Sequence, residues 1–226
     1  MLACALLSVA LAGPSPAAPA QASRPGSTAG EPVDAHAALA RGILRRLEEH
    51  SARTSDLTAR FSQSYRSGML GREIVEQGTV SLKRPGRMRW EYQKPEAKLF
   101  VSDGRRFYFY VPSDRQVIVS EQDEQRSLAA RLLSGKGGLG AEFEAALVEP
   151  LEQGVLRLKL VPRHEQADVE RAFVDVEPSG RIRAILLEDA QGNRTRFRFE
   201  GVRENAGLPD TLFKFEPPPG AEVIQG

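Results

Sequence analysis

One glycine pattern in the sequence has the spacing that binds the phosphates of a nucleotide. Gly135, Gly137 and Gly140 match G-x-G-x-x-G, which holds a dinucleotide when it follows a strand and opens a helix. Here the pattern follows a leucine-rich helical segment, and strands and helices do not alternate along the chain. We therefore interpret these glycines as a flexible hinge and expect no nucleotide cofactor.

The residue types that bind metal ions are scattered. His36, His50 and His164 are not paired at the spacing of a metal site, so we interpret them as surface or helix-face residues. The only cysteine, Cys4, lies in the apolar N-terminal stretch. A domain without this cysteine has no thiol nucleophile, disulfide or cysteine-based metal site. We expect no metal ion.

Acidic and hydroxyl side chains show no catalytic pattern either. Glu121, Asp123 and Glu124 precede a helical segment, where negative charge stabilises a helix N-terminus. The Gly-x-Ser-x-Gly motif of serine hydrolases is absent from the sequence. The chemistry that remains is binding, so the sequence predicts a protein that is not an enzyme.

A two-faced hairpin surrounds the only tryptophan, Trp90. Alternate strand residues face the same side, which gives residues 80–92 one apolar, aromatic face and one charged face. Pro85-Gly86 marks the turn between the strands. Arg84 shares the parity of the apolar face, and an inward arginine needs hydrogen-bond acceptors because an unpaired buried charge is costly. We therefore expect Arg84 to contact backbone or side-chain oxygens.

Several motifs of this region resemble the signature of the outer-membrane lipoprotein carrier family (LolA-type) of Gram-negative bacteria. The resemblance covers most of the chain after about residue 40. It is carried by Lys83-Arg84-Pro85, Arg89-Trp90-Glu91-Tyr92, Pro95, Val101-Ser102-Asp103-Gly104 and the segment from Phe213 to Gly220 with its three prolines.

The resemblance implies an unclosed half-barrel with a helical lid over a hydrophobic cavity. Its function is to carry the acyl chains of lipoproteins through the periplasm, from the inner to the outer membrane. In the family, the arginine of the hairpin holds the lid shut through backbone carbonyls of the lid helices, a role that falls on Arg84. The lid residues implied in this chain are Leu39, Ile43, Leu128, Ala129, Leu132 and Leu133.

Large apolar side chains along the strands are the expected walls of this cavity. A solid sandwich core would fit the same residues nearly as well, and the resemblance decides for a cavity. The expected walls are Phe61, Val80, Leu82, Met88, Trp90, Tyr92, Phe107, Phe109, Leu158, Phe197 and Phe199.

The alternation of apolar and polar residues predicts a mainly β fold with helices. We count about eleven strands, one long helix over residues 34–50 capped by Asp34, and a short helix near residues 121–134. Residues 141–148 fit either a second short helix or an irregular strand. Successive hairpins favour an antiparallel sheet, and a sheet of this size should curl or close. We expect an unclosed antiparallel half-barrel with an α-helical lid.

The N-terminus predicts export. Residues 1–22 read as a signal peptide cleaved near Ala22, although its positive first part is missing. Residues 23–33 are rich in Pro, Gly and Ser and read as a linker, and residues 34–226 form the carrier domain. The net charge of +1 gives no reason to expect nucleic acid as a partner.

The expected protein is a periplasmic monomer. The resemblance implies three partners: acylated lipoprotein cargo, an inner-membrane lipoprotein-releasing ABC transporter and, where present, an outer-membrane lipoprotein receptor. The alternative is a lipid-anchored receptor, or an envelope-stress sensor domain, of the same fold. Acylation of Cys4 would favour the receptor, and cleavage near Ala22 would favour the soluble carrier.

Overall fold

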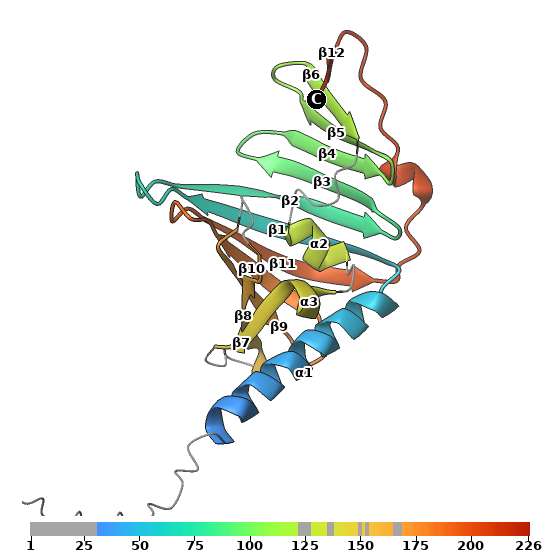
Figure 1. Ribbon diagram of the computed structural model, residues 1–226. Coiled ribbons are helices and arrows are strands. Elements are labelled where there is room, and N and C mark those ends of the chain that lie inside the picture. The colour runs from blue at the N-terminus through green and yellow to red at the C-terminus, as the bar shows by residue number, and fades with distance from the viewer. Residues whose placement is uncertain (1–30, 122–127, 135–137, 149–150, 152–153, 165–168) are drawn as a thin grey trace, which may run out of the picture.

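A single curved sheet organises the molecule (Figure 1). The computed structural model describes residues 31–226 except 122–127, 135–137, 149–150, 152–153 and 165–168. The expected signal peptide and most of the linker therefore lie outside the described residues, as do Asp123 and Glu124 of the acidic cluster and part of the glycine-rich loop. In the described part, twelve strands form one sheet in the order β12-β6-β5-β4-β3-β2-β1-β11-β10-β9-β8-β7. The two end strands, β12 and β7, do not pair, so the sheet is an open half-barrel.

The strands follow the chain through successive hairpins. Each neighbouring pair is antiparallel, except that β12 runs parallel to β6. Their bounds are β1 (Asp56–Arg66), β2 (Glu73–Lys83), β3 (Arg87–Lys94), β4 (Lys98–Asp103), β5 (Arg106–Val111), β6 (Gln116–Glu121), β7 (Phe143–Leu147), β8 (Leu156–Pro162), β9 (Arg171–Val176), β10 (Ile182–Glu188), β11 (Arg194–Glu204) and β12 (Glu222–Gln225).

Alternation of side chains gives the sheet an apolar concave face. Val80 pairs with Trp90, and Leu158 pairs with Val174, so apolar residues meet across neighbouring strands. Gly78 allows the sheet to bend at its centre: a Cβ there would lie 1.9 Å from the carbonyl oxygen of Glu91. The register of β2 against β3 shifts at this point, which is typical of a bulge that increases strand bending.

The helices cover part of this concave face. They are α1 (Glu31–Arg53), α2 (Leu128–Ser134) and α3 (Leu139–Glu142), with a 3-10 helix, η2 (Asp210–Phe213), near the C-terminus. Buried side chains of α1, α2 and α3 belong to one apolar cluster with β1, β2, β3, β8, β9, β10 and β11. Figure 1 shows α1 lying along the sheet near β7, with α3 beside it and α2 farther along the concave face, near β1 and β2.

The structure agrees with part of this prediction and corrects other details. The expected count of about eleven strands agrees with the twelve that the described residues form, of which the last, residues 222–225, pairs with β6. Helix α1 begins at Glu31, so Asp34 lies inside the helix and does not cap it. The segment that fitted either a helix or a strand contains both: α3 is followed directly by β7.

Candidate functional site

Aromatic rings gather at the centre of the concave face. Trp90 of β3 is 7% exposed and meets three rings edge-on. The centroid distances are 5.0 Å to Phe61, 5.6 Å to Phe197 and 6.3 Å to Phe199. Edge-to-face ring pairs of this kind stabilise the fold by more than the burial of their apolar area alone. The cluster joins the two halves of the sheet, because Phe61 lies on β1 and Phe197 and Phe199 lie on β11, the C-terminal strand that pairs with β1.

The aromatic surface continues toward the N-terminal half of the sheet. Tyr92 lies 5.5 Å from Phe100, and Phe100 stacks on Phe109 at 4.4 Å and tilts against Phe107 at 5.9 Å. All four side chains are only half-buried. An apolar surface therefore extends from the buried centre outward over β4 and β5.

Phe100 was missed by the sequence interpretation. It pairs directly with Trp90 across β3 and β4. The signal was available, because Phe100 has the parity of Lys98 and Ser102 and is the large apolar residue of that face. Because Lys98 and Ser102 on the same face are polar, the apolar character of Phe100 was not recognised.

The structure brings the predicted wall residues together on one face. Six of them are buried in the apolar cluster: Phe61, Val80, Leu82, Trp90, Leu158 and Phe199. Three are partly buried against it: Met88, Tyr92 and Phe197. Phe107 and Phe109 lie farther out, in contact with Phe100.

Polar side chains form a belt beside this surface. The hydroxyl of Tyr92 donates a hydrogen bond to Oε1 of Gln63 at 2.5 Å, and Nζ of Lys98 is 2.5 Å from Oε1 of Glu76. Burial, and to a smaller extent the negative charge of Glu76, raises the pKa of the Tyr92 phenol above its ordinary value. Tyr92 therefore stays neutral at physiological pH and keeps the hydroxyl proton that it shares with Gln63 in this hydrogen bond.

The residues expected to form the lid lie on α1 and α2. Ile43, Leu128, Ala129 and Leu132 are buried in the apolar cluster, and Leu133 packs partly buried against it. Leu39 is different: it is 48% exposed, so it does not join the buried stripe of α1. The helix instead buries Ala40, Ile43, Leu44 and Leu47.

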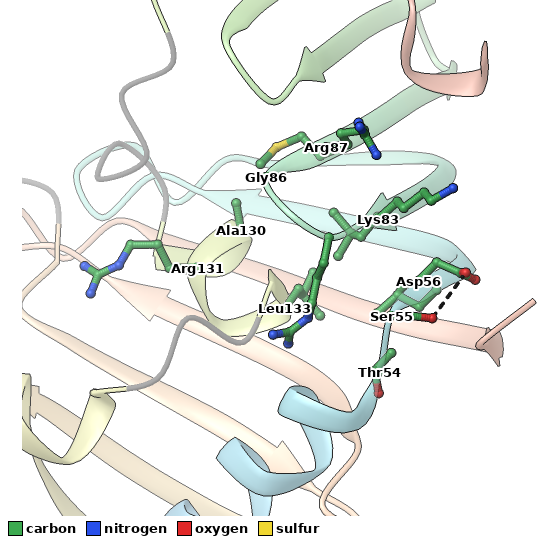
Figure 2. A pocket seen from close by; sticks show the side chains of 13 residues that line it. Thr54, Ser55, Asp56, Lys83, Gly86, Arg87, Ala130, Arg131 and Leu133 are labelled. Carbon is green, nitrogen blue, oxygen red and sulfur yellow. Dashed lines mark hydrogen bonds between the residues drawn. The ribbon is translucent and has the colours of Figure 1, made fainter. Parts of the chain in front are cut away.

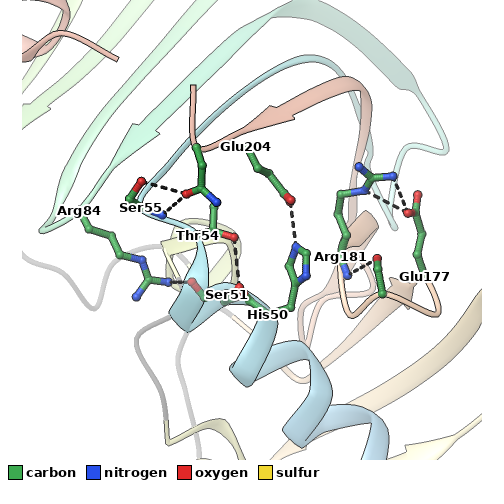
Figure 3. A network of polar contacts seen from close by, with 10 residues as sticks. His50, Ser51, Thr54, Ser55, Arg84, Glu177, Arg181 and Glu204 are labelled. Atoms are coloured by element: carbon green, nitrogen blue, oxygen red, sulfur yellow. Dashed lines mark hydrogen bonds and ion pairs between the residues drawn. The ribbon is translucent and has the colours of Figure 1, made fainter. Parts of the chain in front are cut away.

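Arg84 reaches the C-terminal end of α1. Its guanidinium Nη2 donates a hydrogen bond to the backbone carbonyl of Ser51, and its own backbone N–H donates to the carbonyl of Ser55 at 2.9 Å (Figure 3). Burial lowers the pKa of Arg84 below its ordinary value, yet arginine remains charged in proteins. Ser51 lies about two turns beyond Ile43 and about three turns beyond Leu39, the two residues of this helix that the resemblance assigned to the lid.

Other polar bonds fix the same end of α1 to the sheet. Nε2 of His50 lies 2.9 Å from Oε1 of Glu204, and the hydroxyl of Thr54 donates to the carbonyl of His50 at 3.1 Å. Asp56, at the start of β1, is 4% exposed and accepts the backbone N–H of Ala206 at 2.7 Å. Figure 3 shows the bonds of His50 and Thr54 at the helix end. The end of α1 is thus held by Arg84 in the turn after β2 and by Glu204 of β11, while Asp56 ties the start of β1 to the segment after β11.

Two small cavities lie on either side of Leu133. One, of about 40 Å³, is lined by residues that include Arg84, Leu82 and Met88 (Figure 2). The other, of about 30 Å³, is lined by residues that include Leu57 and Phe199. A single water needs roughly 10–15 Å³ on this measure. Each cavity is therefore large enough for a few waters but too small for a long acyl chain.

Two further observations concern the part of the chain that the structure describes. There, no group of three or more His, Cys, Asp or Glu side chains is placed to hold a metal ion. The described helices include none with the length and apolar character needed to cross a membrane.

Comparison with known proteins agrees with this geometry. Residues 52–216 match the model of the family described as outer membrane lipoprotein carrier protein LolA. The chain belongs to the LolA family. The matched range includes the whole aromatic face, Arg84 and α2, and begins near the end of α1.

Curated relatives carry the same family name. The chain is 32% identical over 194 residues to the outer-membrane lipoprotein carrier protein of Dechloromonas aromatica, covering 85% of this chain and 90% of the relative. It is 37% identical over 157 residues to that of Nitrosospira multiformis, covering 68% of this chain and 75% of the relative.

A solved structure supports the fold alone. An uncharacterized conserved protein from Thermus thermophilus matches with a TM-score of 0.55 at 14% identity, covering 83% of this chain and 99% of that one. The open sheet with covering helices is therefore found at very low sequence identity.

Proposed function

We propose that this LolA-family chain carries the acyl chains of lipoproteins across the periplasm, from the inner membrane to the outer membrane. The observation that carries the proposal is the aromatic concave face, which is buried under α1 and α2 at its centre and half-buried over β4 and β5. The activity is binding and release, without a catalytic step. The family membership and the names of the curated relatives support lipoprotein as the cargo.

The energetics require a site that closes when empty. Each buried CH₂ group contributes about 0.8 kcal/mol, so a long acyl chain involves on the order of 10 kcal/mol and does not cross water uncovered. An empty apolar groove of the same size is equally unfavourable in water. In the closed molecule, Leu132 and Leu133 of α2 occupy this region. We expect cargo to displace α2, and α2 to return on release.

The partners follow from this cycle. A carrier of this kind receives its cargo from a lipoprotein-releasing ABC transporter of the inner membrane and delivers it to an outer-membrane receptor, where one is present. Export to the periplasm, with cleavage near Ala22, and a monomeric state are parts of the same proposal.

Competition between a fluorescent probe and a lipopeptide tests the site. The purified protein should bind bis-ANS with enhanced fluorescence, and a triacylated lipopeptide should displace the probe in proportion to its concentration. The same peptide without acyl chains is the control and should leave the fluorescence unchanged. Absence of probe binding, or equal displacement by the unacylated peptide, would contradict an acyl-chain site.

A further inference from the structure

The hairpin between β1 and β2 exposes apolar side chains at its far end. We name residues 65–75 the hairpin tip. Met69 is 91% exposed and Leu70 is 76% exposed, and behind them Val75, Ile74 and Tyr65 are 49%, 45% and 37% exposed. Figure 1 shows this hairpin projecting beyond the neighbouring strands. Adjacent exposed side chains of this size indicate an interaction surface.

The tip is held in a defined position. The backbone N–H of Gly68 donates to Oδ1 of Asn193 at 3.0 Å, in the turn between β10 and β11. A Cβ on Gly68 would lie 2.6 Å from the carbonyl oxygen of Gln191, so only glycine fits. Within the tip, Ser67 bonds to Arg72 through the backbone at 3.1 Å. Two hairpins therefore brace each other and present Met69 and Leu70 outward.

Basic side chains flank the apolar end. Arg66 and Arg72 are both exposed and stand on either side of Met69 and Leu70 in the sequence. Within the tip, the acidic side chain is Glu73, which pairs in register with Arg66. In the bracing hairpin, Arg194 is engaged by Glu188 at 2.8 Å. The tip itself thus has two arginines against one carboxylate.

We propose that the hairpin tip docks on a phospholipid membrane. Met69 and Leu70 enter the boundary between headgroups and acyl chains, while Arg66 and Arg72 contact lipid phosphates. Long arginine side chains can place their charge among headgroups while their stems remain in apolar surroundings. Tyr65, one step behind, has the amphipathic ring that is enriched at this level of a bilayer.

The shape of the tip favours lipid over a folded protein. Stable protein interfaces bury roughly 800 Å² on each partner, which requires a broad surface, whereas this one is the narrow end of a two-stranded hairpin. A bilayer needs no complementary groove to accept two side chains. The apolar residues followed by arginines also match the sequence of environments from acyl boundary to headgroup.

The docked tip would connect the membrane with the concave face. Tyr65 and Ile74 pair across β1 and β2 and lie on the same face as Phe61. The polar pair Gln63 and Glu76 separates them from the aromatic centre. This inference does not rest on the proposed acyl cargo, because membrane docking is measured on the empty protein.

Vesicle binding tests the proposal. Wild-type protein and Met69→Ser/Leu70→Ser are mixed with vesicles of phosphatidylethanolamine and phosphatidylglycerol, and the bound fraction is measured by flotation. We expect the wild type to bind and the variant to lose roughly tenfold or more in partition coefficient, given the transfer energies of such side chains. The matched control, Val161→Ser/Val223→Ser, changes two exposed apolar residues elsewhere and should bind like the wild type. All variants share one N-terminus, so their difference reports the tip.

A charge variant separates the two parts of the contact. Arg66→Gln/Arg72→Gln should weaken binding to vesicles that contain phosphatidylglycerol by roughly fivefold for each arginine, and should leave binding to neutral vesicles unchanged. A wild type that does not float with vesicles, or a tip variant that binds equally well, overturns the proposal. Sedimentation velocity without lipid tests whether the tip instead mediates self-association. A wild-type dimer that Met69→Ser/Leu70→Ser abolishes, with vesicle binding the same for both proteins, would overturn membrane docking and assign the tip to self-association.

Discussion

Arg84 links the turn between β2 and β3 to the end of α1 through a charged hydrogen bond. Its acceptor, the carbonyl of Ser51, lies in the last turn of the helix and also accepts the backbone N–H of Thr54 at 3.1 Å. A cation at a helix C-terminus is also favoured by the helix dipole. A bond of this type contributes roughly 1.5–3 kcal/mol, which stabilises the closed molecule without making opening prohibitive.

Replacing Arg84 with leucine should shift the carrier toward its loaded state. We expect Arg84→Leu to accept acylated lipoprotein but to release it poorly, because closure of the empty site no longer gains this bond. A bond of about 1.5 kcal/mol or more corresponds to a factor of about ten or more, so the equilibrium constant for release should decrease by at least that factor. Transfer of labelled lipoprotein from the carrier to receptor-bearing vesicles measures it.

A conservative variant distinguishes the bond from general packing. Arg84→Lys keeps a positive donor and should retain part of the transfer, since an ammonium can still reach a carbonyl but lacks the guanidinium fork. Normal transfer by Arg84→Leu would show that the bond to Ser51 has no role in release.

At the scale of elements, α1 demonstrates how one helix face closes the sheet. Leu47 is 0% exposed and packs in the apolar cluster, whereas Leu39, two turns earlier, is 48% exposed. Leu47→Ala should lower the free energy of unfolding by about 2–5 kcal/mol, because it leaves a cavity in the core. The matched substitution Leu39→Ala should change it by less than about 0.5 kcal/mol. Urea unfolding followed by circular dichroism measures both; equal effects would contradict the orientation of α1.

The elements were predictable where the pattern is local. Residues 73–83 are bounded by a turn and residues 106–111 are apolar on both faces, and the strands predicted there match β2 and β5 to the residue. Turns such as Gln191-Gly192-Asn193 separate the strands of a hairpin. Periodicity also placed Ile43 and Leu47 on one face of α1. It could not show that Leu39 is exposed, because the helix extends past the strands that bury its later turns.

The sequence could not predict which segments far apart in the chain contact one another. The parity of Arg84 indicated a carbonyl acceptor, but which helix end meets the turn depends on how α1 crosses the sheet. Likewise, the sequence indicates a last strand pairing at Val223 and Ile224, but it does not show that the partner is β6 or that the two strands run parallel, because the segments are about a hundred residues apart. The aromatic face was largely predicted, whereas the small volume beneath α2 emerges only from packing.

At the scale of the whole molecule, an open sheet must protect its two edges. One edge strand, β12, has only four residues, and all four side chains are exposed. It covers β6 through backbone bonds, including the N–H of Glu222 to the carbonyl of Arg115 at 2.8 Å and that of Gly226 to Val119 at 2.9 Å. Short edge strands of this kind limit pairing with other molecules. By pairing with β6, β12 therefore prevents another protein chain from pairing with that strand.

Removing residues 222–226 should convert the protein from a monomer into a self-associating species. The truncated chain exposes the unpaired N–H and C=O groups of β6, which favour edge-to-edge pairing, while the apolar cluster beneath α1 and α2 stays intact. Sedimentation velocity between about 1 and 100 µM should show growing oligomers for the truncation only, a range in which exposed edges commonly associate. Val223→Ser/Ile224→Ser keeps the backbone of β12 and should remain monomeric. If both proteins stay monomeric, pairing with β12 does not protect the edge; if both associate, the side chains rather than the backbone bonds provide the protection.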